Sequence, residues 1–236
     1  MEIVVVGDLH LPNNEYYPKK KYEEFISRMR ELKCDVLAIT GDICDCTSFI
    51  KAKRIMEFIE NIDAKYKVGV VGNHDLWYSK RAKLYYSNPK RFKILDGEGI
   101  KIGKIGIAGT MGWFDYSFSR IDDFVPPQDD KMKTEIELGK LRRALRDIRG
   151  SDVKIVLMHF SPVPETGRGD IVLSMGGSRS FLDPILEEKV DYVFHGHLHN
   201  SKNIFFQLSG VKFYNSALSA LGFYFLSFDP FEPTLV

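Results

Sequence analysis

The sequence lacks the features that mark a membrane-spanning or secreted protein. Its longest aliphatic and aromatic stretch, residues 217–228, is interrupted by two serines and a glycine and is too short to span a bilayer. The first residues, Met1 and Glu2, precede only a short apolar run, with no basic segment and no cleavage site, which predicts no signal peptide. We therefore expect a cytoplasmic protein without a membrane partner.

The sequence also has no excess of charge of one sign and only a few cysteines. The chain has 33 basic and 32 acidic residues, a net charge of +1, so no overall field attracts it to nucleic acid. Its three cysteines are odd in number, and Cys44 and Cys46 are too close in sequence for an easy disulfide, which fits a reducing compartment. Without repeats or a shift in composition, the 236 residues are expected to form one domain, residues 1–236.

Apolar segments alternate with charged amphipathic segments over the first seventy-odd residues, a pattern typical of parallel strands joined by helices. Glycines then interrupt short apolar runs between residues 92 and 110, which predicts antiparallel hairpins. Strands are expected at 4–7, 36–40, 68–71, 154–158, 190–194, 203–207, 211–215 and 223–228, and helices at 19–32, 48–62, 131–149 and 178–189. The predicted fold is α/β: two mixed β-sheets packed face to face as a sandwich and flanked by helices, in four layers (αββα).

Polar side chains follow the ends of these predicted strands, where open α/β sheets bind their ligands. Three of the six histidines fall within residues 195–199, and alternation along an extended segment points His197 and His199 to the same side. The strand-end set comprises Asp8, His10, Asp42, Asn73, His74, Asp75, His159, His197 and His199. Oxygen and imidazole ligands in this number suit two divalent transition metals, which together hold a water, lower its pKa and clamp phosphoryl oxygens.

Five blocks resemble, in order, the motifs of the calcineurin-like metallophosphoesterase superfamily. They are Asp8-Leu9-His10, Gly41-Asp42, Gly72-Asn73-His74-Asp75, His159 and Gly196-His197-Leu198-His199. The resemblance implies that one metal is held by Asp8, His10, Asp42 and His199. It implies that the other is held by Asp42, Asn73, His159 and His197, with Asp42 as the bridge. The expected cofactors are two divalent ions, and manganese, iron, zinc, nickel and cobalt all tolerate these ligands.

The resemblance also implies that His74 faces the substrate, with Asp75 orienting its ring. An imidazole beside a carboxylate is a competent general acid near neutral pH, able to protonate a leaving oxygen. This sequence departs from the motifs of one branch of the superfamily. Protein serine/threonine phosphatases follow the Gly-Asp block with Asp-Arg-Gly, whereas Asp45 is here followed by Cys46 and Thr47, which argues against a phosphoprotein substrate.

Six further residues have two interpretations each. His195 either orients a metal ligand or is a buried structural histidine, and Asp45 either lies near the bridge or caps the following helix. In the expected loop 113–130, Trp113 and Tyr116 either form an aromatic wall at the pocket mouth or pack within the loop. In or beside the loop 161–177, Arg168 and Arg179 either clamp a phosphate or are solvated.

These residues predict an enzyme that hydrolyses phosphate esters with a hydroxide held between two metals. A small phosphodiester, cyclic nucleotides included, is the preferred substrate, and a phosphomonoester is the alternative. A nuclease would need a basic channel that the sequence does not clearly offer. A non-catalytic metal-binding scaffold would be expected to have lost a ligand, and none is replaced. The oligomeric state is left open.

Overall fold

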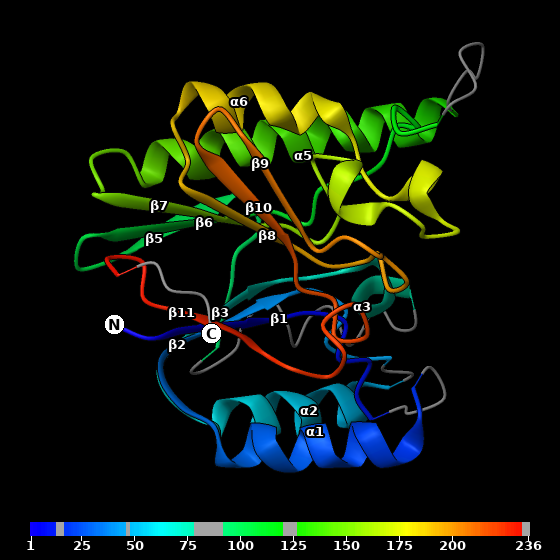
Figure 1. Cartoon of the computed structure of the whole chain (residues 1–236), viewed down its shortest axis with the longest axis vertical. Helices are drawn as coiled ribbons and strands as arrows, with labels where there is room; N and C mark the ends of the chain where they lie inside the picture. The colour runs from blue at the N-terminus through cyan, green and yellow to red at the C-terminus, as the bar shows by residue number, and fades with distance from the viewer. Residues whose placement is uncertain (13–16, 46–47, 78–91, 120–126, 233–236) are drawn as a thin grey trace.

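The computed structural model describes residues 1–12, 17–45, 48–77, 92–119 and 127–232. Two β-sheets pack face to face, and helices cover the outer face of each (Figure 1). From one side to the other the layers are α1 with α2, a five-stranded sheet, a six-stranded sheet, and α5 with α6. This arrangement confirms the predicted four-layer α/β sandwich.

The five-stranded sheet has the order β11-β1-β2-β3-β4, and only β11 is antiparallel to its neighbour. Its strands are β1 (Ile3–Val6), β2 (Lys33–Thr40), β3 (Asp63–Val70), β4 (Lys93–Ile94) and β11 (Leu226–Phe228). The covering helices are α1 (Lys19–Glu31) and α2 (Phe49–Glu60). In α1 the buried residues Tyr22, Phe25 and Met29 recur every three to four positions, so one apolar face packs on the sheet.

The six-stranded sheet has the order β5-β6-β7-β8-β10-β9, with parallel central strands and antiparallel edges. Its strands are β5 (Glu98–Ile102), β6 (Ile105–Gly109), β7 (Val153–Leu157), β8 (Tyr192–His195), β9 (Phe205–Leu208) and β10 (Val211–Asn215). The helices on it are α5 (Gln128–Asp147) and α6 (Leu182–Glu187). Short 3₁₀ turns occupy Glu165–Gly167, Leu173–Met175 and Arg179–Phe181.

Three elements differ from the sequence expectation. Of the antiparallel hairpins expected between residues 92 and 110, only β5–β6 is formed, because β4 joins the five-stranded sheet parallel to β3. The helix predicted at 178–189 is divided into the 3₁₀ turn Arg179–Phe181 and the short α6, because Pro184 lacks an N–H and is tolerated only in the first turn of an α-helix. A further helix, α3 (Asn73–Trp77), begins within the third motif, where only a polar strand end was expected.

Apolar side chains fill all three spaces between the layers. Alternation along β1 sends Val4 and Val6 toward α1 and α2, while Ile3 and Val5 pack between the two sheets. On the far side, residues such as Leu141 and Phe213 pack between the second sheet and its helices. Because the central strands are buried on both faces, the polar residues at their carboxyl ends are held on a rigid support.

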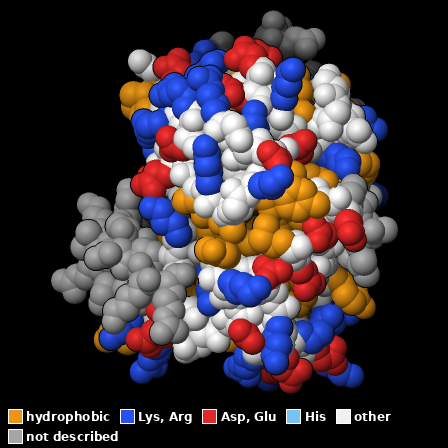
Figure 2. Space-filling view, turned by 90° about the vertical axis from the view of Figure 1, so that its left-hand side faces the viewer, with side chains coloured by type: hydrophobic (Ala, Val, Ile, Leu, Met, Phe, Trp, Pro, Cys, Tyr) orange, Lys and Arg blue, Asp and Glu red, His pale blue; other side chains and the backbone are white. Residues whose placement is uncertain are grey.

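Three further observations bear on the sequence expectations. No described helix has the length and apolar character needed to cross a membrane. Cys34 is free, whereas Cys44 is disulfide-bonded, so the expectation that Cys44 would not take part in a disulfide is wrong. On the face in Figure 2, Lys and Arg side chains are interspersed with Asp and Glu around a central apolar patch, without a continuous basic stripe.

Candidate metal centre

The backbone just beyond the strand ends is held in a conformation that L-residues rarely adopt. Asp8, His10, Asp42 and His197 have φ values of 56°, 47°, 47° and 69°. Non-glycine residues in this left-handed region are uncommon and gather at functional sites, where surrounding structure holds them. All four belong to the set predicted as metal ligands. The unusual backbone angles therefore occur at the residues whose side chains are predicted to bind metal.

Glycines next to these residues allow the carboxylates to lie against the backbone. A Cβ on Gly72 would lie 2.1 Å from Asp42 Oδ1, and a Cβ on Gly196 would lie 2.3 Å from Asp8 Oδ2. Contacts this short do not occur between real atoms, so a larger residue at either position would displace a carboxylate. The glycines of the third and fifth motifs are therefore part of how the site is built.

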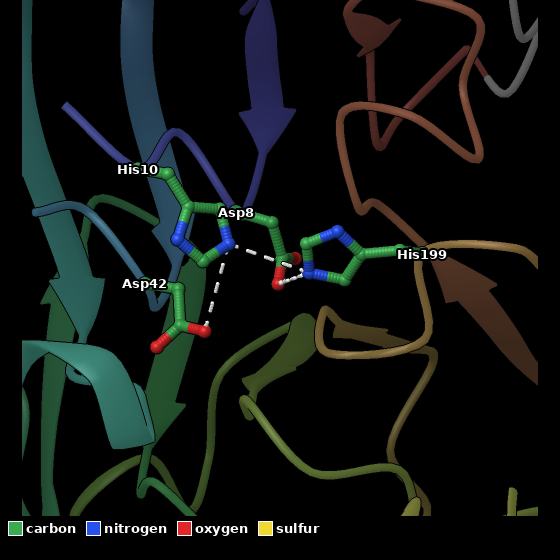
Figure 3. Close-up of side chains that lie close together, drawn as sticks. All are labelled: Asp8, His10, Asp42 and His199. Carbon is green, nitrogen blue, oxygen red and sulfur yellow. Dashed lines mark hydrogen bonds and ion pairs between the residues drawn. The ribbon is translucent and has the colours of Figure 1, made fainter. Parts of the chain in front are cut away.

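The first predicted ligand group is gathered in space. One ligand atom from each of Asp8, His10, Asp42 and His199 lies within 4.8 Å of the others (Figure 3). The Nε2 of His10 is 3.4 Å from the Nε2 of His199 and 3.8 Å from Asp42 Oδ2, and His199 Nε2 is 3.0 Å from Asp8 Oδ1. Two imidazole nitrogens and two carboxylates converging in a largely buried space form a donor set that suits a divalent cation.

The second predicted group shares Asp42 with the first. His159 Nε2 lies 2.8 Å from Asn73 Oδ1 and 3.4 Å from Asp42 Oδ2, while its Nδ1–H donates to the carbonyl of Thr40 at 3.0 Å. The ring of His197 is 5.1 Å from that of His159, centroid to centroid. Its Nε2 is buried and has no hydrogen-bond partner among the described residues. A buried polar atom without a partner calls for an explanation, and a metal ligand provides one.

Electrostatics in the site favour the ionisation states that metal binding requires at Asp42 and His197, but not at His159. Burial by itself would raise the pKa of Asp42, but neighbouring His159 and His10 hold that pKa well below its usual range. Burial lowers the pKa of His197 to about 3, so this ring is neutral at pH 7. For His159, burial is outweighed by the charge of Asp42, which raises its pKa to about 9, so a metal would have to displace a proton there.

His74 is paired with Asp45, and this corrects the expectation for Asp75. Oδ1 of Asp45 is 2.9 Å from His74 Nδ1 and 3.1 Å from His10 Nδ1, so one carboxylate oxygen accepts from both rings. Although burial lowers the pKa of His74, the hydrogen bond to Asp45 and the charge of Asp42 leave it raised. The helix-cap interpretation of Asp45 is wrong, since Ser48 caps α2 by accepting from the N–H of Lys51.

Asp75 points to the backbone instead. Its carboxylate accepts hydrogen bonds from the N–H groups of Cys44 at 2.9 Å and Gly72 at 2.8 Å, and so ties the second motif to the third. Burial, together with the nearby charge of Asp42, raises the pKa of Asp75 to about 7. The carboxylate that is hydrogen-bonded to Nδ1 of His74 is therefore that of Asp45.

His195 matches the structural interpretation. Its Nδ1–H donates to the carbonyl of Gly196 at 2.9 Å, which leaves Nε2 to accept from the hydroxyl of Thr166 at 2.7 Å. Burial lowers the pKa of His195 to about 4, so the ring is neutral. It supports the backbone that leads to His197 and does not itself face the ligand groups.

A cavity of about 690 Å³ opens beside the two ligand groups, and His74 and Trp113 line it. Tyr116 is not among the lining residues. Its hydroxyl lies 3.4 Å from Asp130 Oδ2 and its ring packs edge-on against Phe114, so packing within the loop describes it. Arg168 and Arg179 are exposed and do not line the cavity either, so the solvated interpretation fits both.

Sequence reasoning missed several lining residues. Tyr17 donates its hydroxyl proton to the carbonyl of Asp8 and stacks on His199, with ring centroids 6.2 Å apart. Lys133, Phe160 and Ile171 also line the cavity and come from three separate segments. None of these four residues belongs to one of the five motifs, and none is a polar residue at the end of a predicted strand. The sequence therefore contained no pattern that identified them.

A family model of calcineurin-like phosphoesterases matches residues 1–201. The chain belongs to the calcineurin-like phosphoesterase family. The resemblance read from the five motifs is thereby confirmed, and this calcineurin-like phosphoesterase is a hydrolase acting on phosphoester bonds.

Individual relatives are distant. A protein described as a probable cyclic nucleotide phosphodiesterase, from Vesicomyosocius okutanii, is 22% identical over 227 residues, covering 94% of this chain and 87% of the relative. An uncharacterized metallophosphoesterase of Helicobacter pylori is 23% identical over 158 residues, which is 64% of this chain and 41% of that protein. Among solved structures, the phosphopantetheinyl hydrolase of Mycobacterium tuberculosis superposes with a TM-score of 0.67 at 16% identity, covering 91% and 88% of the two chains. This similarity shows a shared fold.

Proposed function

We propose that this phosphoesterase is a dinuclear metal-dependent phosphodiesterase that cleaves small phosphodiesters. The observation that carries the proposal is the pair of ligand groups that share Asp42 and lie beside His74 at one cavity. The relative described as a probable cyclic nucleotide phosphodiesterase supports the choice of a diester, and makes cyclic nucleotides one candidate substrate.

The donor atoms fit two divalent ions. One ion would be held by Asp8, His10, Asp42 and His199, and the other by Asp42, Asn73, His159 and His197. When bound, such a pair activates water for attack and neutralises charge on the phosphoryl oxygens. The mixture of imidazole, carboxylate and amide oxygen is compatible with manganese, iron, zinc, nickel or cobalt.

His74 is proposed to protonate the leaving oxygen. Asp45 engages Nδ1 of the ring, and His74 lines the cavity beside the two ligand groups. The raised pKa of His74 keeps more of the ring protonated near neutral pH, which is the state that a general acid needs. Asp45 thus acts through His74 and not on the substrate.

The composition of the cavity favours a diester over a monoester or a nucleic acid. Apart from the histidines, Lys133 is the one basic side chain among the described lining residues. A monoester dianion or a polyanionic strand would call for more cations than this near its phosphates. A non-catalytic scaffold is disfavoured because both ligand groups are complete.

The test is a comparison of bis(p-nitrophenyl) phosphate with p-nitrophenyl phosphate on protein reconstituted with each of the five metals. Elemental analysis of the desalted protein is expected to find two ions per chain, and the diester is expected to be cleaved faster. Faster cleavage of the monoester would overturn the choice of diester. A single ion per chain in the active protein would overturn the dinuclear assignment.

A further inference from the structure

The cavity reaches beyond the ligand groups to a cluster of aromatic rings. Trp113 and Phe114 stack at 5.0 Å with their planes 20° apart, and Phe160 packs on both, at 5.0 and 5.6 Å. Phe160 also lies 4.4 Å from the ring of His197, so the cluster adjoins the metal centre. All three rings contribute to the cavity lining.

Helix α5 fixes this aromatic cluster in place. The indole N–H of Trp113 donates to Asp130 Oδ1 at 2.9 Å, and the hydroxyl of Thr134 donates to the carbonyl of Phe114 at 3.1 Å. The apolar part of the cavity is therefore formed before any ligand enters, which reduces the entropy cost of binding.

A second apolar group, Ile171, Val172 and Met175, lines the same cavity. Ile171 is 89% exposed and Met175 is 37% exposed, although both are apolar. The segment is anchored by Asp170, which accepts from the N–H of Val172 at 3.0 Å and from the N–H of Asn200 at 2.7 Å, directly after His199. Apolar side chains held at the rim of a cavity are available to cover an apolar ligand.

Two polar side chains of this outer region, Asp170 and Ser219, are engaged with the protein. Both carboxylate oxygens of Asp170 accept backbone hydrogen bonds, and Ser219 donates to the carbonyl of His199 at 2.8 Å. The Nζ of Lys133 lies 4.4 Å from the centroid of the Trp113 ring. A ligand group rich in hydroxyls would find few free partners here and would lose its hydrogen bonds to water.

We infer that the outer cavity binds a flat, weakly polar ring on the organic part of the substrate. The substrates would then be phosphoesters carrying an aromatic ring system, and not sugar or short alkyl phosphates. Ring burial against Phe114, Ile171 and Met175 supplies the selectivity, because apolar area removed from water stabilises the complex. The inference deepens the proposed function, on which it rests for the reaction, but the binding preference can be measured without turnover.

The experiment compares phenylphosphonate with methylphosphonate, two probes of equal charge that cannot be hydrolysed as esters. Their affinities for the manganese-reconstituted protein are measured by calorimetry for the parent, for Ile171→Ser and for Ile136→Ser. Ile136 is the matched control, since it is 53% exposed on α5 and does not line the cavity. Both substitutions are at exposed positions, so folding should be retained.

We expect the parent to bind phenylphosphonate roughly tenfold more tightly than methylphosphonate. Ile171→Ser should reduce that preference by about three- to tenfold without changing the affinity for methylphosphonate, and Ile136→Ser should change neither. Equal affinity for the two probes in the parent, including no binding of either, overturns the inference. So does an equal loss for both in Ile171→Ser. Failure of the proposed function would appear separately, as preserved ring preference without cleavage of a diester.

Discussion

Replacing Asp45 with asparagine tests whether Asp45 or Asp75 sets the state of His74. The substitution keeps the size of the side chain and removes the negative charge that accepts from His74 Nδ1 at 2.9 Å and from His10 Nδ1 at 3.1 Å. A hydrogen bond to a charged group contributes about 1.5 to 3 kcal/mol. Loss of that amount at His74 corresponds to about a 10- to 100-fold decrease in kcat, since 1.36 kcal/mol is tenfold.

The pH profile gives a second, independent readout. Asp45 is one of the groups that raise the pKa of His74, so Asp45→Asn should lower it. In the proposed mechanism the protonated ring of His74 is the active form, and this form predominates below the pKa. The limb of the kcat profile that falls with rising pH should therefore move to lower pH. His10 loses the same partner, so weaker binding of one metal is expected, and assays are run at saturating metal.

Asp75→Asn is the matched control. Its carboxylate accepts from the N–H groups of Gly72 and Cys44, so the substitution should lower the free energy of unfolding by about 1 to 3 kcal/mol. It should leave the limb of the pH profile in place. A parent-like profile in Asp45→Asn, or a shifted limb in Asp75→Asn, would refute the assignment of Asp45.

Three further outcomes are expected. His197→Ala should bind one metal ion per chain instead of two, because it removes the buried Nε2 that has no protein partner among the described residues, and elemental analysis would detect the change. The metal-free protein should lose up to ~3 kcal/mol of stability between pH 6.5 and about 9. The raised pKa of His159 gives stability that is fully present below its unfolded pKa and is lost as pH rises through about 9. Denaturant titrations at several pH values should show this loss without metal, and metal saturation should abolish it. Gly72→Ala should abolish metal binding or folding, since its Cβ would lie 2.1 Å from Asp42 Oδ1. The control is Gly139→Ala on α5, where an added Cβ would have no atom within 4 Å. Thermal unfolding should show that this control is neutral or stabilising by about 0.5 to 1 kcal/mol.

The layers and the convergence of polar strand ends could be predicted from the sequence because both follow from strand patterning, whereas the division into two ligand groups rested on the family resemblance. Buried strands such as β1 and β2 are apolar on both faces, which identifies them as central, and parallel strands bring their carboxyl ends to the same edge of a sheet. A polar residue at such an end, like Asp8 or Asp42, is then placed without knowledge of any side-chain contact. The same reasoning could not give the backbone angles that aim these side chains.

The partner of His74 could not be predicted in this way. The family resemblance implied Asp75, but both residues lie in α3, and neighbouring positions of a helix point in directions about 100° apart. Asp75 consequently turns toward the backbone of Gly72, while His74 meets a carboxylate from the segment after β2. The cavity was missed for a related reason. Its lining combines Tyr17, Lys133 and Ile171, which no period or motif connects.

The segments after β1 and β2 behave as one unit, and this has a consequence for catalysis. His10 N–H donates to the carbonyl of Asp42 at 2.9 Å, Leu11 N–H to that of Ile43 at 2.9 Å, and Asp45 N–H to that of Leu11 at 3.0 Å. These bonds fix three residues relative to one another: Asp42, the proposed bridge; His10, a proposed ligand of the first metal; and Asp45, the partner of His74. Distortion of this ladder should therefore impair metal binding and proton donation together. Loss of His197, which is contributed by the other sheet, should affect the second metal while leaving His74 paired with Asp45.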